Sequence, residues 1–83
     1  MNREELAARV LALIRSKTDG DGTPIRSDMS FEHDLHMDSA ALIELIDAVE
    51  ADMNVIVADE WLSRLYRVRD LVDAVSDARL VAR

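Results

Sequence analysis

The sequence predicts an all-α fold, a small four-helix bundle of three main helices and one short helix with a long first loop. Three segments carry apolar residues at spacings of three and four, which place these residues on one face of a helix. Both glycines and the only proline lie between the first two of these segments. The 83 residues, 49% of them hydrophobic, are enough for one modest core, so we expect one domain over residues 1–83.

The first helix is predicted over residues 2–17 and the long loop over residues 18–38. Asn2, with Glu5 three residues later, fits a capping box at the start of the helix. The loop opens on a stretch rich in aspartate, glycine and proline, and loops of this length usually have a function or cross a bundle. The residues expected to face the core are Leu6, Val10, Leu13 and Ile14 in the helix, and Ile25, Met29, Phe31 and Leu35 in the loop.

The second helix is predicted over residues 39–53, with Asp38 as its N-cap. Spacing divides it into two faces with different chemistry. The inner face is expected to be Leu42, Leu45, Ile46, Val49 and Met53, and the outer stripe Ala40, Glu44, Asp47 and Ala51.

The rest of the chain is predicted to hold a connector, a short helix and a last helix. Residues 54–57 are short and apolar, which indicates a buried connector. Asp59 is expected to cap a short helix over residues 60–64. The last helix is predicted over residues 68–78, and its inner face is expected to be Val68, Leu71, Val72 and Val75.

Acidic residues are concentrated in the middle of the chain. The formal net charge is −7, and residues 27–63 contain ten acids and no Lys or Arg. Such a segment repels phosphate groups, which argues against nucleic acid and membrane surfaces and favours basic protein partners. A solvated acidic surface kept for solubility is the alternative. No run of about 18 apolar residues is present, and the first residues are charged, unlike those of a signal peptide, so we expect a cytoplasmic protein. We also expect a monomer.

Three candidate sites lack features that their chemistry requires. The run from Asp19 would need Gly at the sixth position and Glu at the twelfth to bind calcium, but Pro24 and Ser30 stand there. His33 and His36 precede the helix and have no second cluster beside them, so loop histidines are favoured over metal ligands. Ser39 lacks the Gly-x-Ser-x-Gly elbow of a hydrolase.

The dipeptide Asp38-Ser39 alone would be ordinary helix-start chemistry, but its surroundings form a longer pattern. Leu35-His36-Met37-Asp38-Ser39 is followed by Glu44-Leu45, by Ala48-Val49-Glu50, by the segment 55–60 and by the valine-led helix. This order resembles the acyl carrier protein family, whose signature is Leu-Gly-x-Asp-Ser-Leu with Glu-Leu five residues after the serine.

The resemblance implies a bundle of the acyl-carrier type and a 4'-phosphopantetheine arm on Ser39, transferred from coenzyme A by a phosphopantetheinyl transferase. Since the chain has no cysteine, the thiol for carrying thioesters would come from this arm. Asp38 is the motif acid, and Ala40, Glu44 and Asp47 are the expected partner face. The implied protein is not an enzyme. Its partners would be an acyl- or aminoacyl-loading ligase and ketosynthase, condensation or acyltransferase enzymes with basic docking patches.

Several positions depart from the family pattern. The departures are His36 for glycine, Ala40 for leucine, Asp47 for an exposed apolar residue, Ala58 for proline, and Arg67 for the Ser or Thr that would cap the last helix. Trp61 is expected to pack over the connector, with a cap over a cargo cavity as the alternative. These departures favour a free-standing carrier in polyketide, nonribosomal peptide or modified acyl-chain biosynthesis. The alternatives are a primary fatty-acid carrier, a D-alanine-type aminoacyl carrier, and an unmodified acidic interaction module.

Overall fold

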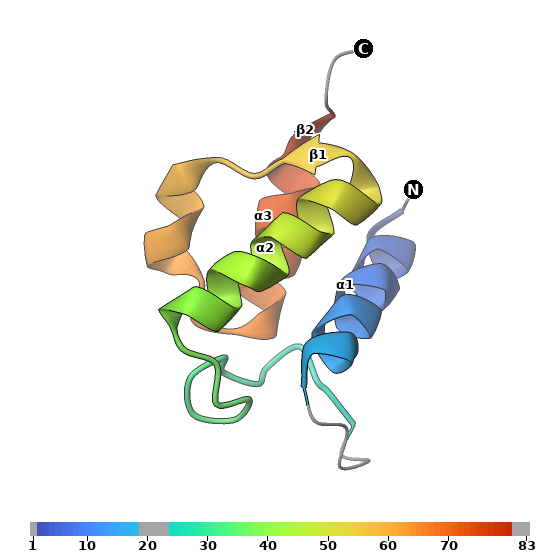
Figure 1. Cartoon of the computed structure of the whole chain (residues 1–83). Coiled ribbons are helices and arrows are strands. Elements are labelled where there is room, and N and C mark those ends of the chain that lie inside the picture. Colours follow the sequence, from blue (N-terminus) through green and yellow to red (C-terminus); the bar gives the residue numbers. More distant parts are fainter. Residues whose placement is uncertain (1, 19–23, 81–83) are drawn as a thin grey trace.

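The computed structural model describes residues 2–18 and 24–80, and it confirms the predicted all-α fold (Figure 1). The helices of the described residues are three α-helices and one 3-10 helix. In Figure 1, α2 crosses the front of the molecule, α3 lies behind it, and α1 lies beside both. The elements are α1 (Arg3–Lys17), α2 (Ser39–Met53), η1 (Asp59–Arg64) and α3 (Val68–Asp77).

The start of α1 follows the expected capping chemistry. Asn2 has extended backbone and its side-chain oxygen accepts a hydrogen bond from the Glu5 amide at 2.9 Å. Because Asn2 is the cap, the helix begins one residue later than predicted, at Arg3. Exposed ion pairs then join α1 to the rest of the bundle, from Arg9 to Asp52 at 2.9 Å and from Arg3 to Asp73.

The hydrophobic core is assembled from all three helices and the long loop. The predicted inner face of α3 is buried throughout, and Leu45 and Val49 of α2 are fully buried. The loop residues Met29 and Phe31 are buried in this core, and Ile25 and Leu35 are partly buried against it. The loop is therefore fixed to the bundle in the way its apolar residues predicted. No polar side chain is buried among the described residues.

The connector after α2 differs from the prediction. Val55–Ile56 forms a short strand, β1, which pairs antiparallel with β2 (Arg79–Leu80). Val55 and Val57 are buried as expected, but Ile56 is 59% exposed because successive residues of a strand face opposite sides. The following short helix begins at Asp59, with Ala58 as its N-cap, so the expected cap at Asp59 is wrong.

The last helix is stabilised at its start in a way that the sequence reasoning did not anticipate. The Asp70 carboxylate accepts hydrogen bonds from the amides of Arg67 and Tyr66, at 2.8 and 3.1 Å. The Arg67 guanidinium donates to the carbonyl oxygen of Asp28 in the loop, at 2.7 Å. The carboxylate at the third helical position thus satisfies two amides that come just before the helix, and the arginine joins the loop to α3.

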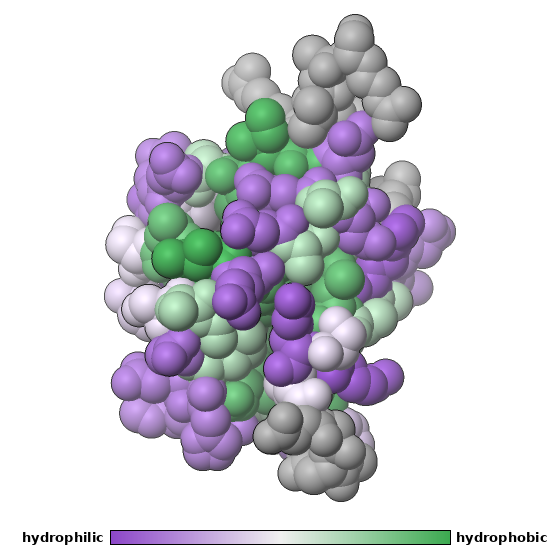
Figure 2. Space-filling view, in the orientation of Figure 1, coloured by the Kyte–Doolittle hydropathy of each residue, from purple (hydrophilic) through white to green (hydrophobic). Residues whose placement is uncertain are grey.

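The surface of the described chain is mixed. Figure 2 shows hydrophilic groups along the face over α2 and hydrophobic surface at the left of the view, over η1. In the described part of the chain, no helix has both the length and the apolar composition needed to cross a bilayer.

Candidate functional site

Ser39 is the first residue of α2, and its side chain is exposed. Asp38 precedes it with extended backbone, and the Asp38 carboxylate accepts a hydrogen bond from the Ala41 amide at 2.8 Å. The Asp38 carbonyl accepts the first helical bond, from Leu42, at 2.9 Å. Asp38 is therefore the N-cap that the sequence predicted, and it fixes the position of the serine at the helix start.

The first turn of α2 has two free hydrogen-bond donors next to the serine. Among the described hydrogen bonds, the amides of Ser39 and Ala40 have no protein acceptor. Such amides, together with the positive end of the helix dipole, favour an anionic group at a helix start. A phosphodiester on the Ser39 hydroxyl therefore fits the chemistry of this position.

The loop before Ser39 is held in a closed shape by its own side chains. The Ser30 amide donates to the Asp34 carboxylate at 2.7 Å, and the Ser30 hydroxyl accepts from the His33 amide at 2.9 Å. Phe31 is buried, and its carbonyl accepts from the Met37 amide at 2.7 Å. The chain leading into Asp38 is thus fixed at several points.

Main-chain hydrogen bonds also join the loop to the start of α3. The Phe31 amide donates to the Tyr66 carbonyl at 3.0 Å, and the Val68 amide donates to the Met29 carbonyl at 2.9 Å. Between them, Ser30 and Arg67 form an isolated antiparallel bridge. The loop and residues 66–68 therefore act as one wall beside the first turn of α2.

His36 adopts backbone that is unusual for a residue with a side chain. Its φ is 55°, in the left-handed region. Glycine reaches this region without steric cost, whereas other L-residues do not. This backbone suits the glycine that the family signature has at this position, and in this chain a histidine adopts it.

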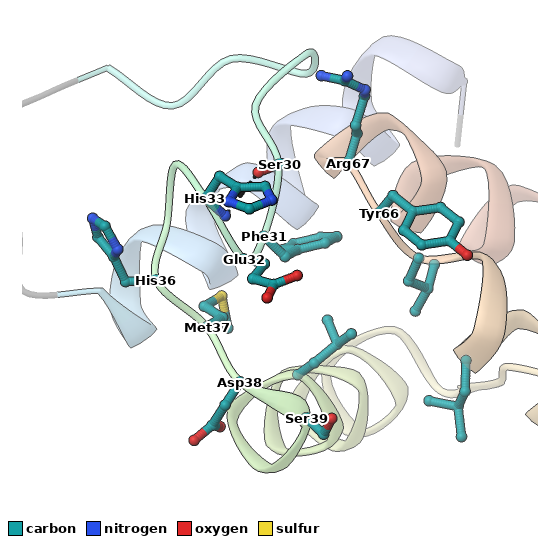
Figure 3. A pocket seen from close by; sticks show the side chains of 13 residues that line it. Ser30, Phe31, Glu32, His33, His36, Met37, Asp38, Ser39, Tyr66 and Arg67 are labelled. Carbon is teal, nitrogen blue, oxygen red and sulfur yellow. Dashed lines mark hydrogen bonds between the residues drawn. The ribbon is translucent and has the colours of Figure 1, made fainter.

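A pocket of about 650 Å³ lies between the loop, the first turn of α2 and the end of η1 (Figure 3). Its base is apolar and includes Phe31, Met37 and Leu65, all buried. Ser39 and Asp38 lie at its edge. The remaining lining residues are Ser30, Glu32, His33, His36, Leu42, Leu62, Tyr66 and Arg67.

The structure separates the predicted site residues into two groups. Ser39 and Asp38 line the pocket, whereas Ala40, Glu44 and Asp47 do not line it and are exposed on α2. Sequence reasoning had considered His33 only as a metal ligand, with Glu32 beside it, and had assigned neither residue to the carrier site. The available signal was that both follow an anchoring aromatic, Phe31, in a loop that ends at the serine. No metal-holding group of three His, Cys, Asp or Glu side chains occurs among the described residues.

Trp61 does not line the pocket and is partly buried against the core. The Arg64 guanidinium lies 5.8 Å from the centre of its ring. This position agrees with the packing interpretation of Trp61 rather than with a cap over a cargo cavity.

Comparisons with known proteins give the family. A family model described as a phosphopantetheine attachment site matches residues 8–75. An acyl carrier protein of Thermosynechococcus vestitus is 31% identical over 77 residues, which cover 93% of this chain and 95% of that protein. The chain belongs to the acyl carrier protein family. Acyl carrier protein 2 of Pseudomonas aeruginosa is 29% identical over 90% of this chain and 95% of its own length. An acyl carrier protein of Treponema pallidum is 33% identical over 87% of this chain and 92% of its own length.

Membership of the acyl carrier proteins confirms the resemblance and the prosthetic group it implied. That group is 4'-phosphopantetheine, and acyl carrier proteins are carriers rather than catalysts. The residues present fit the group, because an exposed hydroxyl, two free amides and an adjacent pocket meet at the start of α2. When bound, the arm supplies the thiol that this cysteine-free chain lacks.

Proposed function

We propose that Ser39 is the attachment point of the arm and that the protein holds acyl or aminoacyl groups on it as thioesters. The observation that carries this proposal is the exposed Ser39 hydroxyl, beside the free Ser39 and Ala40 amides and at the edge of the pocket. A phosphopantetheinyl transferase would join the hydroxyl oxygen to the phosphate next to the pantetheine of coenzyme A. The hydroxyl proton is lost, and the nucleoside bisphosphate leaves as the phosphoanhydride bond breaks.

We test the attachment by incubating the protein with coenzyme A and a transferase of broad specificity. Intact mass should rise by one phosphopantetheine in the wild type and in Ser76→Ala, a control at an exposed serine of α3. The Ser39→Ala protein should stay folded, because the side chain is exposed, and it should remain unmodified. Modification of Ser39→Ala, or no modification of the wild type by several transferases, would refute the assignment.

We propose further that the carrier serves specialised biosynthesis, such as polyketide, nonribosomal peptide or modified acyl-chain assembly. Two departures from the family pattern, Ala40 and Asp47, are exposed on α2, where an enzyme would meet them. A primary fatty-acid carrier and a D-alanine-type carrier are the alternatives within the family. Intact mass of the protein from its own host would distinguish these, because the mass beyond the arm identifies the cargo.

The proposed partner face is the outer stripe of α2, formed by Ala40, Glu44 and Asp47. All three are exposed, and no Lys or Arg occurs within residues 27–63 to neutralise the acids. The proposed partners would therefore dock through basic patches. These partners are the transferase, a loading ligase, and ketosynthase, condensation or acyltransferase enzymes.

Charge reversal tests this face. Glu44→Lys with Asp47→Lys should slow transfer to a partner enzyme, and rising salt should slow the wild type more than this double variant. Reversal of Glu4 and Glu5, which are exposed in the first turn of α1, is the control and should change the rate much less. Equal rates for both pairs of reversals, without salt dependence in the wild type, would show that the acids serve solubility.

A further inference from the structure

The pocket beside Ser39 has little positive charge available to a bound group. Two of its walls come from residues 27–63, which contain no Lys or Arg. The only arginine in its lining, Arg67, donates to the Asp28 carbonyl at 2.7 Å, and Figure 3 shows its guanidinium pointing away from Ser39. A hydrogen bond from Arg26 lowers the pKa of Asp28, and the charge of Arg67 lowers it further. The guanidinium of Arg67 is therefore already engaged by the main chain of Asp28.

One acidic side chain faces this pocket without a partner. The Glu32 carboxylate has no hydrogen bond or ion pair within the described chain, and Figure 3 shows it projecting into the space between the loop and α2. The backbone on both sides of it is fixed, since Phe31 is buried and the His33 amide donates to the Ser30 hydroxyl. The Asp38 carboxylate is occupied as the helix cap and points away in Figure 3. Glu32 therefore carries the unpaired negative charge that a group in the pocket would meet.

We propose that this pocket selects the cargo of the arm by charge, accepting an acyl group that carries an amine and rejecting one that ends in a carboxylate. This inference rests on the proposed attachment at Ser39. Phe31, Met37 and Leu65 offer apolar contact to the methylene part of a short cargo. An ammonium group near Glu32 is attracted to its carboxylate. A carboxylate there is repelled, and the lining holds no Lys or Arg that is free to neutralise it.

The experiment uses three cargoes of similar size that differ in charge: β-alanyl, butyryl and succinyl groups. Each is joined to the arm through an amide in place of the thioester, so that it stays attached, and is loaded onto Ser39 from the matching coenzyme A analogue. Thermal unfolding then gives the Tm of each loaded protein. We expect the β-alanyl form to melt about 3 °C above the butyryl form and the succinyl form to melt below both.

Charge-matched variants separate the pocket from the overall charge of the protein. Glu32→Gln should bring the three Tm values together, whereas Glu60→Gln, at an exposed acid of η1 that does not line the pocket, should keep their order. His33→Gln should also keep the order. Equal Tm values in the wild type, persistence of the order in Glu32→Gln, or its loss in His33→Gln would overturn the inference while leaving the attachment intact. Failure of every cargo to load onto Ser39, seen by mass before melting, would instead refute the proposed function.

Discussion

Replacing His36 by glycine should stabilise the fold, although it removes a side chain. The φ of 55° at this residue lies in the left-handed region, which costs an L-residue roughly 1–2 kcal/mol. Glycine avoids this cost but loses more backbone freedom on folding, by about 0.5–1 kcal/mol. The side chain is exposed, so little packing is lost. We therefore expect His36→Gly to raise the free energy of unfolding by about 0.5–1 kcal/mol.

Urea unfolding of four proteins measures this effect. His36→Ala removes the same imidazole but keeps a Cβ, so it should be less stable than His36→Gly by about 1 kcal/mol. Ala12→Gly, at an exposed position inside α1, should lose about 1 kcal/mol, because there glycine only adds freedom to the unfolded chain. If glycine destabilises position 36 as much as position 12, the left-handed backbone at His36 is not the reason for the family's glycine.

Two further predictions concern the core and the last helix. Leu45→Ala should lower the free energy of unfolding by about 2–4 kcal/mol, because Leu45 is fully buried; an unchanged urea midpoint would mean that the inner face of α2 is wrongly assigned. Asp70→Ala should lower the free energy of unfolding by about 1–2 kcal/mol, since it removes the acceptor of the Arg67 and Tyr66 amides, whereas Asp77→Ala at the exposed end of α3 should lower it little. Asp70→Ala should also speed hydrogen exchange at the amides of Arg67 and Tyr66. Unchanged exchange at these amides would contradict the capping role.

The helices could be predicted because their signals are local. Spacings of three and four identified the inner faces of all three α-helices, and Asp38 marked the start of α2 through a hydrogen bond that spans only three residues. The loop residues Met29 and Phe31 could be predicted to be buried because a polar stretch offers few other apolar groups. The position of Ser39 at the helix start followed from the same local chemistry, whereas its assignment as the attachment point followed from the resemblance to the family.

The parts that could not be predicted depend on contacts between distant segments. Pairing of β1 with β2 joins residues about 25 positions apart through main-chain groups, which leave no side-chain pattern in two-residue strands. The pocket depends on the loop meeting residues 66–68, again through main-chain hydrogen bonds. The acid at Asp70 did carry a readable signal, because it stands three residues after Arg67, where a capping box has its acid.

The geometry of α2 allows its three roles to be studied separately. Because of helical spacing, Leu45 and Val49 lie in the core, whereas Glu44 and Asp47 lie on the exposed face. Ser39 lies at the first position of the helix, beside the pocket. A substitution on the outer stripe should therefore alter docking without altering stability. Substitution of Ser39 should alter loading of the arm without altering docking or stability. Because Glu44 and Asp47 lie on the same helix as Ser39, the proposed attachment point, an enzyme that docked on these acids would also meet the serine. On our proposals, the charge of α2 thus bears on where a partner docks, whereas Glu32 in the loop bears on what the arm carries.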